Sequence, residues 1–171
     1  HPHDAADLVP EPEATSGTVF AVVNYLRLLA PPAPAMPNAT LDRGAVVFGD
    51  VGCAACHVPT LQTGTAAVAA LSNRPVTPYS DLLLHDMGDA LADHRPDQGA
   101  SGREWRTTPL WGLRLIRQFL NGEAFLLHDG RARTIEEAIL LHGGEAQRLR
   151  DRVNGLTPAD RAGLIDFVGS R

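Results

Sequence analysis

Two cysteines and a histidine stand within five residues of one another, in the stretch Cys53-Ala54-Ala55-Cys56-His57. Two thiols three positions apart can both form thioethers with the vinyl groups on one edge of a porphyrin. A histidine directly after the second thiol then lies under the iron as its proximal ligand. The chain has no other cysteine, which excludes a disulfide framework and a four-cysteine zinc or iron–sulfur site. The spacing therefore predicts one covalently attached haem c, held by Cys53, Cys56 and His57.

Other uses of a Cys-x-x-Cys pair fit this sequence less well. A thioredoxin-like redox pair requires a strand–helix setting and a lowered thiol pKa, and nothing near these cysteines favours either. A mixed cysteine and histidine zinc site needs two more ligands at short spacing, and His85 and His94 are too far apart to supply them. The remaining alternative to haem is a chain that carries Cys53 and Cys56 as a dithiol.

The second axial ligand of the iron has four candidates, which are His85, Met87, His128 and His142. His142 ends a predicted helix in which it lies at i+7 from Ile135, on the same side as Ala138 and Ile139. An imidazole on this apolar side is costly to bury without a partner, and an iron bond would satisfy it. The alternative is a histidine that interacts with the carbonyl groups at the end of the helix.

Met87 is the rival ligand, at helical offsets from Leu83 and Leu84, and its thioether would raise the reduction potential relative to two imidazoles. Ordinary core packing is the other interpretation of this methionine. His128 precedes a turn and is expected to brace a loop. His85, beside Asp86, could equally be a hydrogen-bonded group near the cofactor.

Helices are the elements that must position these residues. Ser16 is a predicted cap for a helix to about residue 30, and Thr40 opens a helix over 41–48. Thr134 and Glu137 form a predicted capping box, and Thr157 caps a last helix to residue 168 with Pro158 at its first position. No alternating strand of convincing length occurs, so the predicted class is all-α, a cytochrome c-like helical domain around one haem with long loops. The predicted division is residues 1–39, a tail, helix and Pro-rich linker, and residues 40–171, the haem domain.

Composition narrows the function classes further. The 171 residues are 44% hydrophobic and 20% charged, as in an ordinary globular protein, and the net charge of −5 argues against a nucleic-acid partner. No apolar run reaches the roughly 18 residues that a membrane span needs. The chain begins at His1 without a signal segment, so we expect that a leader or a preceding domain has been removed. Association with a membrane through such a missing part stays open.

Several longer segments resemble a known family. In order along residues 41 to 168, the sequence is similar to the C-terminal haem domain of bacterial di-haem cytochrome c peroxidase-like proteins, in the branch of di-haem thiol oxidoreductases. The segments that carry the resemblance are 44–48, 52–59, 79–88, 104–112, 127–132 and 134–146.

The resemblance implies site residues and partners. The superfamily takes its distal ligand from the helix after a His-Asp-Gly motif, as Met in the peroxidases and Tyr in relatives that mature methylamine dehydrogenase. The corresponding position here is His142. The family also implies a second haem on an N-terminal domain. Its peroxidases bind calcium through a Thr-x-Pro segment, which is replaced here by residues 123–125, and this departure argues against calcium.

Two functions follow from this interpretation. The first is the C-terminal electron-relay half of a di-haem, peroxidase-like oxidoreductase, with a preceding haem domain or a redox protein as partner. The alternative is a stand-alone monohaem cytochrome c electron carrier without enzyme activity. Covalent haem predicts a periplasmic or otherwise extracytoplasmic location, while the substrate stays open between peroxide, a thiol, a metal ion and a protein side chain. Further candidate cofactor contacts are Trp105 or Trp111 as an apolar wall, and Arg106, Arg114 or Arg131 as partners of the haem propionates.

Overall fold

The computed structural model describes residues 12–171, which fall into two compact units divided between Pro31 and Pro32. The described part of the first unit is one helix, α1 (Ser16–Leu28). Thr15 caps this helix by accepting a hydrogen bond from the Thr18 amide, so the predicted cap at Ser16 is wrong by one residue. Most apolar side chains of α1 are exposed. No helix among the described residues is long and apolar enough to cross a membrane.

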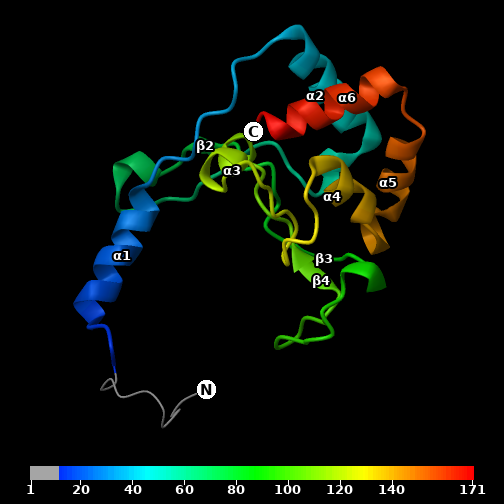
Figure 1. The fold of residues 1–171 in the computed structure, drawn as a ribbon. Coiled ribbons are helices and arrows are strands. Elements are labelled where there is room, and N and C mark those ends of the chain that lie inside the picture. The colour runs from blue at the N-terminus through cyan, green and yellow to red at the C-terminus, as the bar shows by residue number, and fades with distance from the viewer. Residues whose placement is uncertain (1–11) are drawn as a thin grey trace. The chain divides into compact units, whose positions relative to one another are not determined.

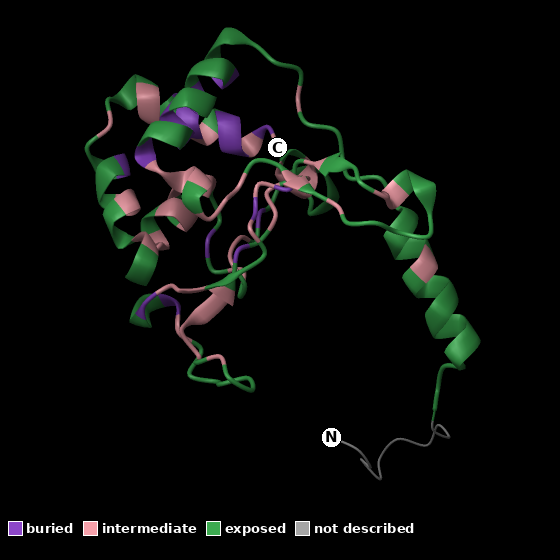
Figure 2. Ribbon diagram, turned by 180° about the vertical axis from the view of Figure 1, so that it is seen from behind, coloured by how far each residue is buried: buried purple, intermediate pink, exposed green. Residues whose placement is uncertain are grey.

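The second unit is built around two helices, α2 (Ala39–Val51) and α6 (Pro158–Gly169), which pack side by side (Figure 1). Shorter helices surround this pair: α3 (Leu113–Phe119), α4 (Ile135–Leu141) and α5 (Gln147–Asn154). Most residues of the buried core lie on α2 and α6, as Figure 2 shows, and Val153 on α5 joins them. This core consists of Val47, Phe48, Val51, Val153, Leu164, Phe167 and Val168.

The backbones of α2 and α6 approach one another closely at two glycines. A Cβ atom added to Gly44 would lie only 2.1 Å from the carbonyl oxygen of Gly163 and 2.6 Å from the Cβ of Phe167. Next to this crossing, the rings of Phe48 and Phe167 have their centroids 5.4 Å apart. The two helices therefore interlock at a point where any side chain on Gly44 would overlap backbone atoms.

Four short strands complete the unit. β1 (Leu61–Gln62) pairs with β2 (Pro75–Val76), and β3 (Leu84–Asp86) pairs with β4 (Glu104–Arg106), both antiparallel. Single turns of 3₁₀ helix form η1 (Cys53–Ala55), η2 (Ala69–Leu71), η3 (Asp89–Leu91) and η4 (Gly144–Ala146). The prediction of a mostly helical chain with long loops is confirmed, but the expected absence of strands is wrong for these two pairs.

Two predicted helix caps are confirmed, and two predicted helix ends differ from the structure. The capping box of Thr134 and Glu137 is present, with both reciprocal hydrogen bonds, and Thr157 caps α6 as predicted. The second helix is longer than expected, since it begins after the cap residue Asn38 and continues through Gly49 to Val51. Helix α4 ends at Leu141 with His142 as its C-cap, one residue before the predicted end. The inward placement predicted for His142 agrees with the burial that lowers its pKa.

Candidate functional site

The Cys-x-x-Cys-His stretch lies directly after α2. Gly52 ends that helix in a left-handed conformation, and Cys53 begins η1. The His57 amide donates to the Cys53 carbonyl over 2.9 Å, which closes one helical turn through the motif. Cys53 also packs against the core, and both thiols are half-buried and unpaired. The motif is therefore a compact turn anchored on the core helix.

The environment of both thiols disfavours the thiolate form. Burial raises the pKa of Cys53 to about 11. The pKa of Cys56 is also raised, first by burial and then by the negative charges of Asp81 and Glu145. Reactive dithiols need a lowered pKa, because the thiolate is the nucleophile. These surroundings argue against dithiol redox chemistry at Cys53 and Cys56.

His57 is oriented by a backbone carbonyl. Its Nδ1 lies 2.9 Å from the carbonyl oxygen of Tyr79, and because a carbonyl only accepts, Nδ1 carries the proton and donates. Tyr79 has a φ of 53°, a left-handed conformation that is uncommon for a tyrosine. Arg171 fixes this tyrosine by donating to its hydroxyl over 3.2 Å. In the neutral His57 ring, Nε2 therefore carries no proton and its lone pair is free to bind a ligand.

His142 is held in the same way. Its Nδ1 donates over 2.6 Å to the carbonyl oxygen of Ala138, in the last turn of α4. Burial lowers the pKa of His142, and burial also lowers the pKa of His57, which the nearby His142 lowers further. His142 is therefore near enough to His57 to disfavour a positive charge on its ring. Among residues 12–171 neither Nε2 atom has a hydrogen-bond partner.

This donor set fits a covalent haem. Two thiols three residues apart supply the attachment points, and two neutral imidazoles present unprotonated Nε2 atoms, the form in which histidine binds iron. A hydrogen bond from Nδ1–H to a backbone carbonyl is the usual way in which a ligand histidine is oriented. Beside His57, the Phe48 ring lies 6.4 Å from the His57 ring and 5.9 Å from the Tyr79 ring, centroid to centroid. His57 therefore borders the aromatic part of the core.

A charged network lies beside Cys56. His85 is bonded through Nε2 to Asp81 and through Nδ1 to Glu145, both over 2.9 Å. Its Nδ1 is also 3.8 Å from the Cys56 sulfur. Hydrogen bonds from His85 and from backbone amides lower the pKa of both carboxyls, whereas Glu145 and then Asp81 raise the pKa of His85. The hypothesis that His85 is a hydrogen-bonded group fits this arrangement, although its partners are not the adjacent Asp86.

The raised pKa of His85 makes a pH dependence predictable. A histidine whose pKa is raised by folding stabilises the protein fully below about pH 6.5, and this contribution is lost as the pH rises through the raised value. We expect His85→Gln to lower the free energy of unfolding by about 1 kcal/mol at about pH 5.5 and by less at about pH 9. Urea titrations of both proteins at the two pH values measure this difference. An equal loss at both pH values contradicts it.

The structure places Met87 near His142, although not as predicted. Leu84 belongs to strand β3, so the helical offsets that favoured Met87 do not exist. Instead the Met87 carbonyl oxygen lies against Gly143, where it would be 2.9 Å from an added Cβ atom. Both candidate distal ligands therefore come from one junction of the chain, and the choice between them remains a prediction.

The other candidates lie in different surroundings. His128 stacks on Trp105 with ring centroids 4.5 Å apart, and burial and then Arg106 lower the pKa of His128. Trp111 is 37% exposed, while its neighbours Leu110 and Leu113 pack against the core. The roles of Trp111 and Trp105 as a wall of the cofactor remain predictions.

The arginines proposed for the propionates are engaged with protein groups. Arg131 donates to the Ala90 carbonyl and to the Asp129 carboxylate. Arg114 donates to the Ala33 carbonyl over 2.6 Å, and Arg106 is exposed on β4. Arg131 therefore braces a loop in this structure, and its role toward haem remains a prediction.

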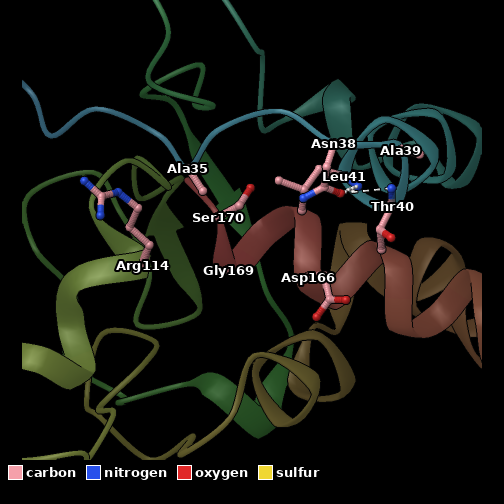
Figure 3. A pocket seen from close by; sticks show the side chains of 9 residues that line it. All are labelled: Ala35, Asn38, Ala39, Thr40, Leu41, Arg114, Asp166, Gly169 and Ser170. Atoms are coloured by element: carbon pink, nitrogen blue, oxygen red, sulfur yellow. Dashed lines mark hydrogen bonds between the residues drawn. The ribbon is translucent and has the colours of Figure 1, made fainter.

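One cavity lies away from the cysteines. It has a volume of about 670 Å³ and lies between the start of α2, the end of α6 and the linker before α2 (Figure 3). Ala35 in that linker donates to the Ser170 carbonyl over 2.8 Å. The cavity is wide open and lined by small residues, with Arg114 and Asp166 as its charged members. Among the predicted site residues, Arg114 lines it, and neither cysteine nor any candidate iron ligand does.

Three residues of the site were not predicted from the sequence. Tyr79 acts through its backbone carbonyl, so no side-chain pattern could reveal it. Glu145 is 60 residues from its partner His85, and pairs so distant leave no local signal in one sequence. Asp81 stands four residues before His85, a spacing that would suggest contact only on a helix, which this segment is not.

Comparisons with known proteins identify one family. Residues 3–171 match the family model described as "Di-haem oxidoreductase, putative peroxidase". No curated protein and no solved structure matches the chain. The match covers nearly the whole chain, including the cysteine motif and both histidines.

Proposed function

Because the chain belongs to the di-haem oxidoreductase family, we propose that it is a haem c electron-transfer domain, the C-terminal relay half of such an oxidoreductase. In this proposal Cys53 and Cys56 attach one haem through thioethers, and His57 and His142 hold the iron from its two sides. The bound haem supplies a one-electron iron couple. Its partner is a preceding haem domain or a separate redox protein, in the periplasm or another extracytoplasmic compartment.

One observation supports the proposal above all: His57 and His142 are each held by a backbone carbonyl in the same way. Each ring donates its Nδ1 proton to a backbone carbonyl, to Tyr79 over 2.9 Å and to Ala138 over 2.6 Å. Both rings are mostly buried and their pKa is lowered by burial, so both stay neutral at neutral pH. Two such rings, one of them inside a Cys-x-x-Cys-His turn, suit axial ligation better than any other role of histidine.

The residues then determine what the domain can do. With a haem bound, His57 and His142 would be its two protein ligands and would leave no place on the iron for substrate or water. Two imidazoles favour a lower reduction potential than a histidine and methionine pair does. Phe48 and Tyr79 keep water from the proximal ring, which the Tyr79 carbonyl holds in one orientation. The domain therefore passes electrons, and any chemistry on a substrate takes place elsewhere.

The visible spectrum of the chain, made with a haem maturation system, tests this function. We expect a low-spin c-type spectrum in the reduced protein that does not change when CO is added. A high-spin, CO-responsive spectrum would show an open axial position and would place substrate chemistry on this domain. A chain that takes up no haem, despite a working maturation system, would overturn the proposal.

Replacement of the distal ligand gives the sharpest form of this test. His142→Ala is expected to open one axial position, so that the reduced protein binds CO fully where the wild type binds none. His94→Asn serves as a control, because His94 is an exposed loop residue with a φ of 57°, which asparagine tolerates. Met87→Leu tests the rival ligand. If Met87→Leu opens the iron and His142→Ala does not, Met87 is the distal ligand.

A further inference from the structure

The segment after His142 rests directly on the segment after β3. A Cβ atom added to Gly144 would lie 2.2 Å from the Asp86 carbonyl oxygen, and Gly144 has a φ of 51° that favours glycine. At Gly143 an added Cβ would lie 2.9 Å from the Met87 carbonyl oxygen. The two backbones are in contact, so a shift of one requires a shift of the other.

Glu145 fastens these segments with both of its carboxylate oxygens. Oε1 accepts a hydrogen bond from the Asp86 amide over 3.1 Å, and Oε2 is bonded to Nδ1 of His85 over 2.9 Å. Since Glu145 is only three residues from His142, this double attachment restrains the turn that carries the imidazole. The Glu145 side chain is 57% exposed, but its partner His85 is only 18% exposed.

The attachment continues to the cysteine motif. His85 is bonded through Nε2 to Asp81, whose own backbone amide donates to the Cys56 carbonyl over 2.8 Å. A second Asp81 oxygen accepts from the Leu83 amide over 2.9 Å. Hydrogen bonds thus run without a gap from Cys56 through Asp81 and His85 to Glu145.

From this chain of contacts we propose that His85 and Glu145 are positioning residues that hold His142 at a fixed place relative to the Cys53–Cys56 attachment. This inference rests on the proposed function, because it assigns His142 as the distal ligand. Neither His85 nor Glu145 is hydrogen-bonded to the Nε2 atom of His57 or of His142. They act by fixing the turn from which His142 reaches the iron.

The cluster of Cys56, Asp81 and His85 is less suited to binding a metal ion. Ligand atoms of Cys56, Asp81 and His85 lie within 4.8 Å of one another, among the residues that the structure describes. Both nitrogens of His85 are already bonded to carboxylates, and Cys56 would carry a thioether, a weaker donor than a thiolate. The carboxylates of Asp81 and Glu145 therefore accept hydrogen bonds from the His85 ring, and no lone pair of His85 is left to bind a cation.

The test is the CO response of the reduced holoprotein. Glu145→Ala removes both hydrogen bonds, and we expect the reduced variant to bind CO at a concentration at which the wild type binds none, because a charge-assisted bond no longer restrains the turn. Glu145→Gln keeps an acceptor for the Asp86 amide and a partner for His85, so it should restore the response to near wild type. His85→Ala combined with Glu145→Ala should add little to either single change, because the two residues act as one unit.

Glu136→Ala is the matched control. Glu136 lies on α4 and is bonded to Arg161 over 3.2 Å, so its loss leaves the turn after His142 in place and CO binding unchanged. If His142→Ala binds CO and Glu145→Ala behaves as wild type, the positioning role is overturned and the proposed function stands. If His142→Ala leaves the spectrum unchanged, the ligand assignment itself fails. If Glu145→Ala does not accumulate as folded protein, Glu145→Asp replaces it, because aspartate has one methylene less and reaches less far. Glu145→Asp should then raise CO binding, and unchanged CO binding overturns the inference.

Discussion

The Cys53→Ala/Cys56→Ala variant, made with a haem maturation system, is expected to contain no covalently bound haem. Both thioethers of the proposed attachment are lost, and His57 and His142 alone could hold only a dissociable haem. Haem staining after denaturing electrophoresis, or extraction into acidified acetone, measures this directly. The wild type should keep its haem through both treatments, and the variant should lose it completely.

Single replacements and a neighbouring control refine this result. Cys53→Ala or Cys56→Ala alone leaves one thiol, so any haem that remains attached should show a spectrum between those of haem b and haem c. Ala55→Ser changes an exposed residue inside the motif and should keep full attachment. Haem that stays covalently bound in the double variant would contradict the assignment of these cysteines.

A second large effect is expected where α2 and α6 cross. Gly44→Ala should lower the free energy of unfolding of the haem-loaded protein by about 3 kcal/mol, because the new methyl group overlaps backbone atoms that cannot rotate away. The added carbon would lie 2.1 Å from the Gly163 carbonyl oxygen and 2.6 Å from the Phe167 Cβ. Denaturant titration followed by circular dichroism measures the loss.

The same helix supplies the control for this prediction. Gly49 also lies within α2, but it is exposed, and an added Cβ atom there meets nothing within 4 Å. Gly49→Ala should therefore raise the free energy of unfolding by about 0.5–1 kcal/mol, the ordinary helix preference of alanine over glycine. A Gly44→Ala variant as stable as the wild type would show that the two helices can separate freely at their crossing.

Local patterns were the most predictable part of this protein. The cysteine motif spans five residues, and the capping box of Thr134 and Glu137 spans four, so each is complete within one turn of chain. The expected end of the second helix near Gly49 was wrong, because packing against α6 outweighs the small cost of an exposed glycine inside a helix. Strands of two or three residues are too short to show an alternation, which is why both pairs were missed.

For the candidate site, the sequence indicated individual residues but not the contacts between them. His142 could be selected from its spacing, but its position one residue beyond α4 depends on the contacts of Gly143 and Gly144 with a distant segment. The bond between His85 and Glu145 joins residues 60 positions apart, and the Tyr79 carbonyl belongs to the backbone. Such contacts are produced by the three-dimensional packing and have no counterpart in the order of residues.

The position of His142 just outside α4 bears on how this family of proteins can diversify. A residue within a helix is limited to the few rotamers that the preceding turn allows, whereas a residue in the following turn has more conformational freedom. Here the scaffold beneath that turn is held by two glycines and by Glu145, none of which depends on the identity of residue 142. The resemblance to proteins that use Met or Tyr at the corresponding position fits this arrangement. If residue 142 is the distal ligand as proposed, evolution could exchange that ligand, and with it the reactivity of the domain, without rebuilding the helix that precedes it.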